Sequence, residues 1–179
     1  MNPDQPSNPN PAERRHTISV VVAQNLNALA RIIGIFSGRG FEIDSISFGT
    51  GGDPDKARVT ITTVGDQHIV EQITKQLHKV IDVIKVTDLT FEPFVERELA
   101  IIKVSTNTRP NDRSEIMQIA QVFRAKIIDI SQKKISMEVT GNKDKIDAAI
   151  GMMRPFGIAE IARTGSVALK REYQGDTQL

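Results

Sequence analysis

The sequence predicts an α+β protein made of two ferredoxin-like βαββαβ domains. The order strand, helix, strand, strand, helix, strand occurs twice along the chain, and a proline-containing segment, Glu92–Phe94, separates the two occurrences. Proline removes a backbone donor and restricts the residue before it, so this segment suits a domain boundary. Each half has roughly 75 residues and therefore a marginal core, so we expect association through sheet edges or helices.

We divide the chain into four parts on this basis. Residues 1–15 are a disordered tail, 16–91 form the first domain, 95–171 form the second, and 172–179 are a C-terminal tail. The first tail contains four prolines and almost nothing apolar. It cannot bury enough surface to offset the entropy of ordering.

The first half opens with a strand at residues 18–23, where β-branched residues alternate with smaller ones. A helix follows, with Asn25 or Asn27 as its expected N-cap and with Gly38 and Gly40 at its expected end. The apolar stripe of this helix recurs at positions i, i+3, i+4 and i+7: Leu29, Ile32, Ile33 and Phe36.

Two hairpin strands and a second helix complete the first half. A strand is expected from Phe41 to Ser47, and a glycine-rich hairpin turn at 49–54 joins it to a strand at 57–65. These glycines are not a nucleotide-binding fingerprint, because no helix follows them directly. Asp66 is the expected cap of the next helix, and a fourth strand spans 80–89. That helix has the stripe Ile69, Ile73 and Leu77, flanked by Val70.

The second half repeats this order of elements. Strands are expected at 99–104, 127–130, 135–139 and 158–161. Two helices lie between them, with apolar stripes at Ile116, Ile119, Ala120 and Phe123 and at Ile146, Ala149, Ile150 and Met153.

The composition excludes several classes of partner. The net charge of +1, from 23 basic and 22 acidic residues, gives no global attraction to nucleic acid or to anionic membranes. An RNA-binding βαββαβ domain would carry stacking aromatics on its central strands, and residues 57–64 contain none.

No apolar run approaches membrane-spanning length, and the N-terminus has no apolar signal core. The chain has no cysteine, which fits a reducing compartment, so we expect a cytoplasmic protein.

We find no convincing catalytic constellation. His68 and His78 are ten positions apart on one expected helix, a spacing that suits no metal pair. No glycine-flanked serine is placed for a nucleophile elbow. The carboxylates near the domain boundary are expected to be solvated: Asp82, Asp88, Glu92, Glu96 and Glu98. The loop at 24–28 remains the functional candidate, since backbone N–H groups at a helix N-terminus suit a carboxylate.

Several long, ordered blocks lie between His16 and Arg171: ISVVV, ALARIIGIFSGRGFEIDSIS, TITTVGD, VEQITKQLHKVIDVIKV, ERELAIIKV, FRAKIIDIS, TGNKDKIDA and FGIAEIARTGSVALKR. Together they resemble the small, regulatory subunit of acetolactate synthase, also called acetohydroxyacid synthase, which starts branched-chain amino-acid synthesis. The resemblance covers nearly the whole segment, which makes it more specific than a short motif.

The resemblance implies a non-catalytic subunit that activates a catalytic large subunit and confers feedback inhibition by a branched-chain amino acid such as valine. It implies an N-terminal ACT domain that forms a homodimer and holds the amino-acid effector at the interface of the pair. It also implies no cofactor in this chain, because thiamine diphosphate, magnesium and FAD belong to the large subunit in that family. The effector-binding residues that it implies are Gln24, Asn25, Leu26, Asn27, Ala28, Leu29, Glu42 and Ile43.

This chain departs from the pattern of valine-sensitive members in both of the segments that carry it. Those members resemble N-E-x-G-A/V-L at the loop and R-G-F/Y-N-I at the second strand. Here Gln24 replaces the first asparagine, Asn27 replaces the loop glycine, and Glu42 replaces the later asparagine. Asn27 adds a side chain and Glu42 adds a carboxylate, so we expect valine to bind weakly.

Two other functions remain as alternatives. The chain could be a free-standing ACT-type amino-acid sensor acting on another enzyme or on transcription, or an RNA-binding module. The blocks in the second half favour the subunit, because a generic sensor has no place for them.

Overall fold

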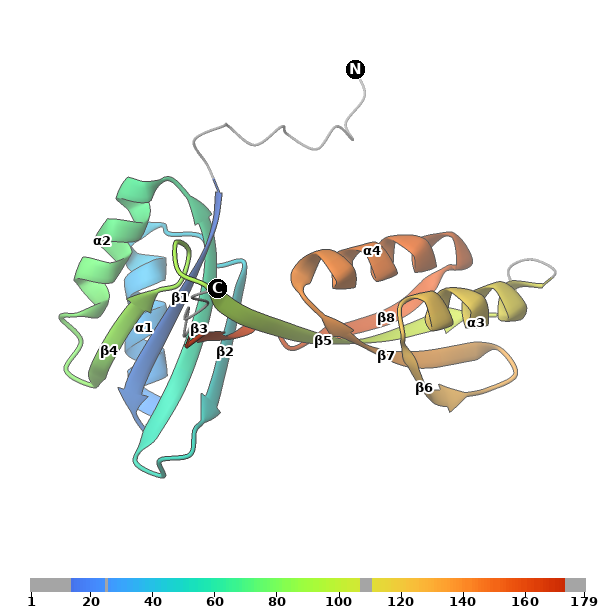
Figure 1. Cartoon of the computed structure of the whole chain (residues 1–179), viewed down its shortest axis with the longest axis horizontal. Coiled ribbons are helices and arrows are strands. Elements are labelled where there is room, and N and C mark those ends of the chain that lie inside the picture. The colour runs from blue at the N-terminus through green and yellow to red at the C-terminus, as the bar shows by residue number, and fades with distance from the viewer. Residues whose placement is uncertain (1–13, 25, 107–110, 173–179) are drawn as a thin grey trace, which may run out of the picture. The chain divides into compact units, whose positions relative to one another are not determined.

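The computed structural model describes residues 14–24, 26–106 and 111–172, which form two compact units (Figure 1). Unit 1 comprises the described residues up to Val95 together with those from Ala168 on, and unit 2 comprises Glu96–Val167. Each unit contains the order βαββαβ, so the predicted α+β fold with two ferredoxin-like domains is confirmed. The rest of the two predicted tails, residues 1–13 and 173–179, lies outside the described residues.

Unit 1 is a four-stranded antiparallel sheet in the order β2-β3-β1-β4. Its elements are β1 (Arg14–Ala23), α1 (Leu26–Arg39), β2 (Ser45–Thr50), β3 (Lys56–Gly65), α2 (Gln67–Leu77) and β4 (Val83–Asp88). Alternate residues of β1 and β3 join the apolar stripe of α2 and Leu29, Ile32 and Phe36 of α1 in one core. The prediction that Ile33 belongs to the same buried stripe is wrong, because it lies about 100° around the helix from Ile32 and is 42% exposed. The largest buried side chains of this core are Ile18, Ile32, Phe36, Ile61, Ile73 and Leu77.

Unit 2 has the strand order β6-β7-β5-β8, and β9 also pairs with β5. Its elements are β5 (Phe94–Ser105), α3 (Asp112–Val122), β6 (Lys126–Ile130), β7 (Lys134–Gly141), α4 (Lys143–Met153), the short 3-10 helix η1 (Arg154–Phe156) and β8 (Ile158–Arg163). The partner strand β9 (Val167–Lys170) belongs to unit 1 from Ala168 on. Its separate core combines the two expected helical stripes with β5 and β7. The stripe predictions for both helices are confirmed.

A Schellman motif ends α1 and orients the chain toward β2. Gly40 has a φ of +68°, and the Phe41 N–H donates to the Phe36 carbonyl at 3.0 Å. The rings of Phe36 and Phe41 pack edge to face with centroids 6.0 Å apart. The prediction that Gly38 also ends the helix is wrong, since Gly38 lies inside α1.

The predicted N-cap at Asp66 is confirmed, and unit 2 repeats it. Asp66 accepts a hydrogen bond from the Ile69 N–H at 2.8 Å, and Asn142 accepts one from the Lys145 N–H at 3.2 Å. A glycine precedes each cap, because a Cβ there would press against the side chain of residue 69 or 145. The same device therefore starts α2 and α4.

Several predicted boundaries in unit 1 are wrong. β1 already begins at Arg14, where Arg14 and Arg15 pair with Gly65 and Val64 of β3. This pairing uses backbone atoms, so the two charged side chains do not form the apolar alternation by which the sequence analysis recognised strands. β2 begins only at Ser45, because Phe41 to Asp44 form the loop that follows the Schellman turn.

The predicted starts of β4 and β5 are also wrong, and the sequence analysis missed β9. Residues 80–82 form a turn that precedes β4 at Val83. β5 begins at Phe94, directly after Pro93, and has β9 as an additional partner strand. β9 has four residues and buries only Ala168, too little for a sequence pattern to indicate a strand.

Replacing Phe36 by alanine is expected to destabilise the chain by about 3 to 5 kcal/mol, because the change leaves a cavity and removes the ring that packs on Phe41. Chemical denaturation measures this loss of free energy of unfolding. Ile81→Ala is the control, since its side chain is 87% exposed and its loss should cost about 0.5 kcal/mol or less. Equal losses for the two variants would contradict the assigned core face.

Candidate effector site

The candidate loop joins the end of β1 to the start of α1. The Ala23 N–H donates to the Asp82 carbonyl and the Gln24 N–H donates to the Asp55 carbonyl, each at 2.9 Å. The loop is therefore fixed both to the turn that precedes β4 and to the hairpin that precedes β3. The partial positive charge at the N-terminus of α1 lies at the same place.

Three of the predicted effector residues belong to the core of unit 1. Ala28 is fully buried, and Leu29 and Ile43 are partly buried against the same apolar cluster. Their side chains hold α1 on the sheet, which leaves only their backbone atoms or exposed edges for a ligand.

The exposed members of the predicted set are Gln24, Asn27 and Glu42. Asn27 lies in the first turn of α1, so it is not the N-cap. The other N-cap candidate, Asn25, lies outside the described residues, as does the side chain of Leu26. Glu42 lies in the loop after α1, and its carbonyl accepts a hydrogen bond from Thr63 Oγ1 at 2.6 Å.

The structure does not bring the two parts of the predicted site together within one chain. The 14 residues of α1 separate the loop at its N-terminus from Glu42 beyond its C-terminus, a rise of about 20 Å. β3 gives a second measure of the distance between the two parts. Gln24 is hydrogen-bonded to Asp55, just before the start of β3, whereas Glu42 is hydrogen-bonded to Thr63, near the end of β3. Eight residues of strand span about 26 Å.

The edge strands of the two sheets differ in their regularity. In the described part of the chain, β2, β4, β6 and β8 are the edges. The pairing of β4, β6 and β8 with their neighbours is interrupted by a register shift, whereas β2 pairs with β3 without one. Since irregularities of this kind blunt an edge against further pairing, β2 is the edge best suited to accept another strand.

The flank of α1 on the β2 side is apolar. Arg31 pairs with Asp82, which lies just before the opposite edge strand β4, at 2.8 Å. Ile33 follows about 200° further around the helix, and its side chain is 42% exposed. Phe48 of β2 is only partly buried against the core. An exposed apolar strip therefore lies beside the regular edge.

A buried histidine in unit 1 was missed by the sequence analysis. His16 has no exposed surface, and its two ring nitrogens lie 3.1 Å from Thr90 Oγ1 and 3.2 Å from the Gly65 carbonyl oxygen. The sequence held a signal for it, because His16 continues the alternation of Ile18, Val20 and Val22 on the buried face. Both nitrogens are used in the fold.

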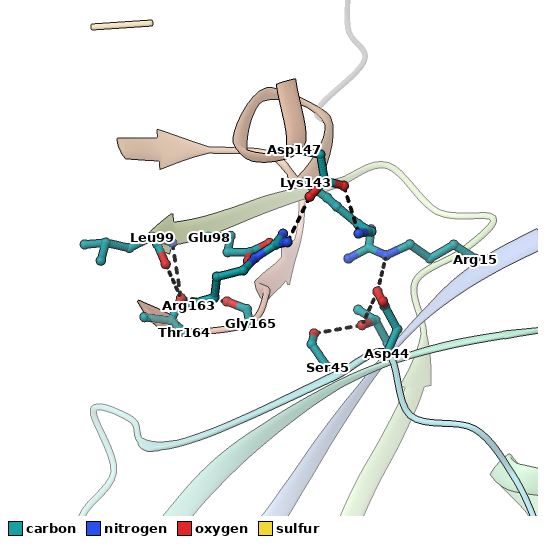
Figure 2. Close-up of polar contacts among 11 residues, drawn as sticks. Arg15, Asp44, Ser45, Glu98, Leu99, Lys143, Asp147, Arg163, Thr164 and Gly165 are labelled. Atoms are coloured by element: carbon teal, nitrogen blue, oxygen red, sulfur yellow. Dashed lines mark hydrogen bonds and ion pairs between the residues drawn. The ribbon is translucent and has the colours of Figure 1, made fainter. Parts of the chain in front are cut away.

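The carboxylates of unit 2 are used structurally as well. Figure 2 shows Arg163 between Glu98 and Asp147, with hydrogen bonds of 2.5 and 2.9 Å, and Lys143 bonded to Asp147 at 2.9 Å. Glu98 is only 5% exposed, so the prediction that it is solvated is wrong. Its charge is compensated by Arg163, a residue 65 positions away that the sequence could not place beside it.

The same network shifts the pKa values of its members. Burial raises the pKa of Asp147, but hydrogen bonds from Lys143 and Arg163 outweigh burial and lower that pKa below its ordinary value. The hydrogen bond to Glu98 is the main cause of the raised pKa of Arg163. These shifts stabilise the charged forms, which suits an ion-pair network and not a proton-transfer site.

Among the described residues, no group of three or more histidines or carboxylates is placed to hold a metal ion. His68 and His78 are exposed at opposite ends of α2. No helix in the described ranges combines the length and the apolar character that crossing a bilayer requires.

Comparison with known proteins assigns the family. A family model for the "AHAS small subunit-like ACT domain" matches residues 18–85, and a model for the "Small subunit of acetolactate synthase" matches residues 97–172. The acetolactate synthase small subunit of Aquifex aeolicus is 45% identical over 159 residues, which cover 89% of this chain and 82% of that relative. The chain belongs to the acetolactate synthase small subunit family.

Two further relatives agree with this assignment. The probable acetolactate synthase small subunit of Archaeoglobus fulgidus is 46% identical, with 88% of this chain and 97% of that relative covered. The crystal structure of the small subunit from Thermotoga maritima superimposes with a TM-score of 0.80 at 38% identity, covering 89% of this chain and 99% of that chain.

Family membership has direct consequences for function. The small subunit is the regulatory subunit of acetolactate synthase and not the catalytic one, so its partner is a catalytic large subunit. The cofactors of the reaction belong to that large subunit. The predicted family, its first domain of ACT type and its regulatory role are confirmed.

Acid should weaken unit 2 through Asp147. A carboxyl group whose pKa is lowered by folding contributes stability above its unfolded pKa, near 3.9, and loses it as the pH falls through the lower folded value. We therefore expect the free energy of unfolding of the natural chain to fall more between pH 6 and about pH 3 than that of Asp147→Asn. Urea titrations at the two pH values measure the difference, and identical losses would contradict it.

Proposed function

We propose that this chain binds the large subunit of acetolactate synthase, raises its activity and makes it responsive to a branched-chain amino acid. Family membership over both units carries the proposal. The alternative of a free-standing ACT sensor is less favoured, because the family model at residues 97–172 covers unit 2, which such a sensor does not need. The absence of cysteine supports a cytoplasmic location.

The effector site in this proposal lies between two copies of the chain. The loop at 24–29 of one copy would face Glu42 and Ile43 of the other, since α1 keeps these segments about 20 Å apart within one copy. A homodimer formed through the β2 edges satisfies this requirement, and the regular pairing of β2 and the exposed Ile33 beside it support this arrangement.

The chemistry of the ligand follows from the two ends of this site. The N-terminus of α1 favours the carboxylate of an amino acid. Asn27 is exposed in the first turn of α1 and occupies part of the approach. Glu42 brings a negative charge that favours an ammonium group and disfavours a carboxylate, so its effect depends on which end of the ligand it meets.

The first test is activity. The isolated chain is expected to show no acetolactate synthase turnover, whereas adding it to the large subunit from the same source should raise turnover severalfold. Co-purification of the two chains measures binding separately from activation. Turnover by the isolated chain, or binding without any change in turnover, would contradict the proposed activation.

Dimerisation is tested at the apolar flank of α1. Ile33→Asp places a charge in the expected interface and should raise the dissociation constant of the dimer by at least about tenfold. Ile81→Asp is the matched control, because Ile81 is 87% exposed in the turn before the opposite edge strand and should leave the dimer intact. Sedimentation velocity distinguishes the species. Dissociation by the control alone would place the interface at the β4 edge instead.

Effector binding is tested by calorimetry. Valine is expected to bind the natural chain weakly, and the double variant Asn27→Gly, Glu42→Asn should bind it at least about tenfold more tightly, because it removes a side chain and a carboxylate from the site. Leucine and isoleucine are measured in parallel to establish selectivity. Tight binding of valine by the natural chain would refute the assigned roles of Asn27 and Glu42.

A further inference from the structure

The first unit contains a short segment from the far end of the sequence. The chain leaves unit 1 after Val95 and returns to it at Ala168. The returning segment is β9 with the residue that follows it, Val167 to Arg171, and we refer to it as the strap. The ACT family model ends at residue 85, and the sequence analysis placed these residues in the second domain.

Besides the pairing of β9 with β5, two polar contacts hold the strap where the chain leaves unit 1. Lys170 Nζ lies 2.5 Å from Glu92 Oε2, and the Arg171 N–H donates to the Pro93 carbonyl at 2.8 Å. Glu92 is itself fixed, because its N–H donates to the carbonyl of Leu89. Leu89 is buried, and its N–H donates to the Thr17 carbonyl of β1 at 2.8 Å.

The strap buries very little apolar surface. Ala168 is the one buried side chain in β9, while Val167 and Leu169 are more than half exposed. The ion pair joins side chains that are 53% and 42% exposed, so water and salt screen it. A four-residue strand with so few buried contacts opens locally at lower cost than the longer strands of its sheet.

We propose that the Glu92–Lys170 pair is a clasp that closes the strap on unit 1, and that the strap opens and closes while the rest of the unit stays folded. With the clasp closed, Lys170 and Arg171 are held beside Glu92 and Pro93. With the clasp open, the pairing of β9 with β5 still attaches the start of the strap. The inference does not rest on the proposed function.

The test uses the full chain and trypsin, which cleaves after Lys170 and Arg171. Glu92→Lys replaces the attraction by repulsion and should speed cleavage at these sites about two- to fivefold, with an equal loss of hydrogen-exchange protection at the Arg171 amide. Raising the salt concentration should speed cleavage of the natural chain but not of the variant.

A charge exchange and a control complete the design. Glu92→Lys combined with Lys170→Glu should restore slow cleavage after Arg171, since the pair is rebuilt with its signs reversed. Glu71→Lys is the control, because Glu71 forms an exposed ion pair with Lys75 on α2, at 3.9 Å, and should leave cleavage at the strap unchanged.

Each outcome decides the proposal. Faster cleavage in Glu92→Lys, restored by the exchange and without a change in melting temperature, supports a clasp that opens locally. Unchanged cleavage and exchange would show that the pair does not hold the strap. If the charge-exchange variant did not restore protection, the effect of Glu92→Lys would not be specific to the pair, and the proposal would be overturned. If the melting temperature fell together with protection, the variant would unfold globally, which would overturn the proposal as well.

Discussion

The length of α1 is the constraint on which the proposed effector site depends. A helix of 14 residues is rigid over its length and is fixed to the sheet by Ile32 and Phe36. It keeps the loop at its N-terminus about 20 Å from Glu42 beyond its C-terminus, so the two segments can meet only when a second copy supplies one of them. A ligand bound there would stabilise the pair, because it would bind the dimer better than the separate chains.

Polar groups that could perform chemistry are used to hold the chain together. Glu98 is compensated by Arg163, His16 bonds through both of its ring nitrogens, and Asp66 caps α2. Burial of such groups is stable only when each has a partner, and the partners here come from other strands, from the turn after β4 or from the first turn of a helix. This use of the polar residues agrees with a family in which a separate subunit carries out catalysis.

The two units share a plan but differ in what they present to other proteins. Both start their second helix after a glycine and an N-capping side chain, Asp66 or Asn142. The edges of unit 2 are both irregular, whereas unit 1 has one regular edge, β2, with the exposed Ile33 on the flank of α1 beside it. Self-association is therefore expected of the ACT unit, which also contains the residues of the proposed effector site.

The sequence by itself determined the elements whose pattern is periodic. The stripe through Ile32 and Phe36 and the alternation from Ile18 specified the first βαββαβ unit, and the stripes through Ile116 and Ile146 specified the second. Local spacing was sufficient because it sets which face of a helix or strand is buried. Only the tertiary structure decided that Glu98 is buried against Arg163, that the strap returns to the first unit, and that the loop and Glu42 lie at opposite ends of α1. Those facts depend on contacts between residues far apart in the chain, which no local pattern encodes.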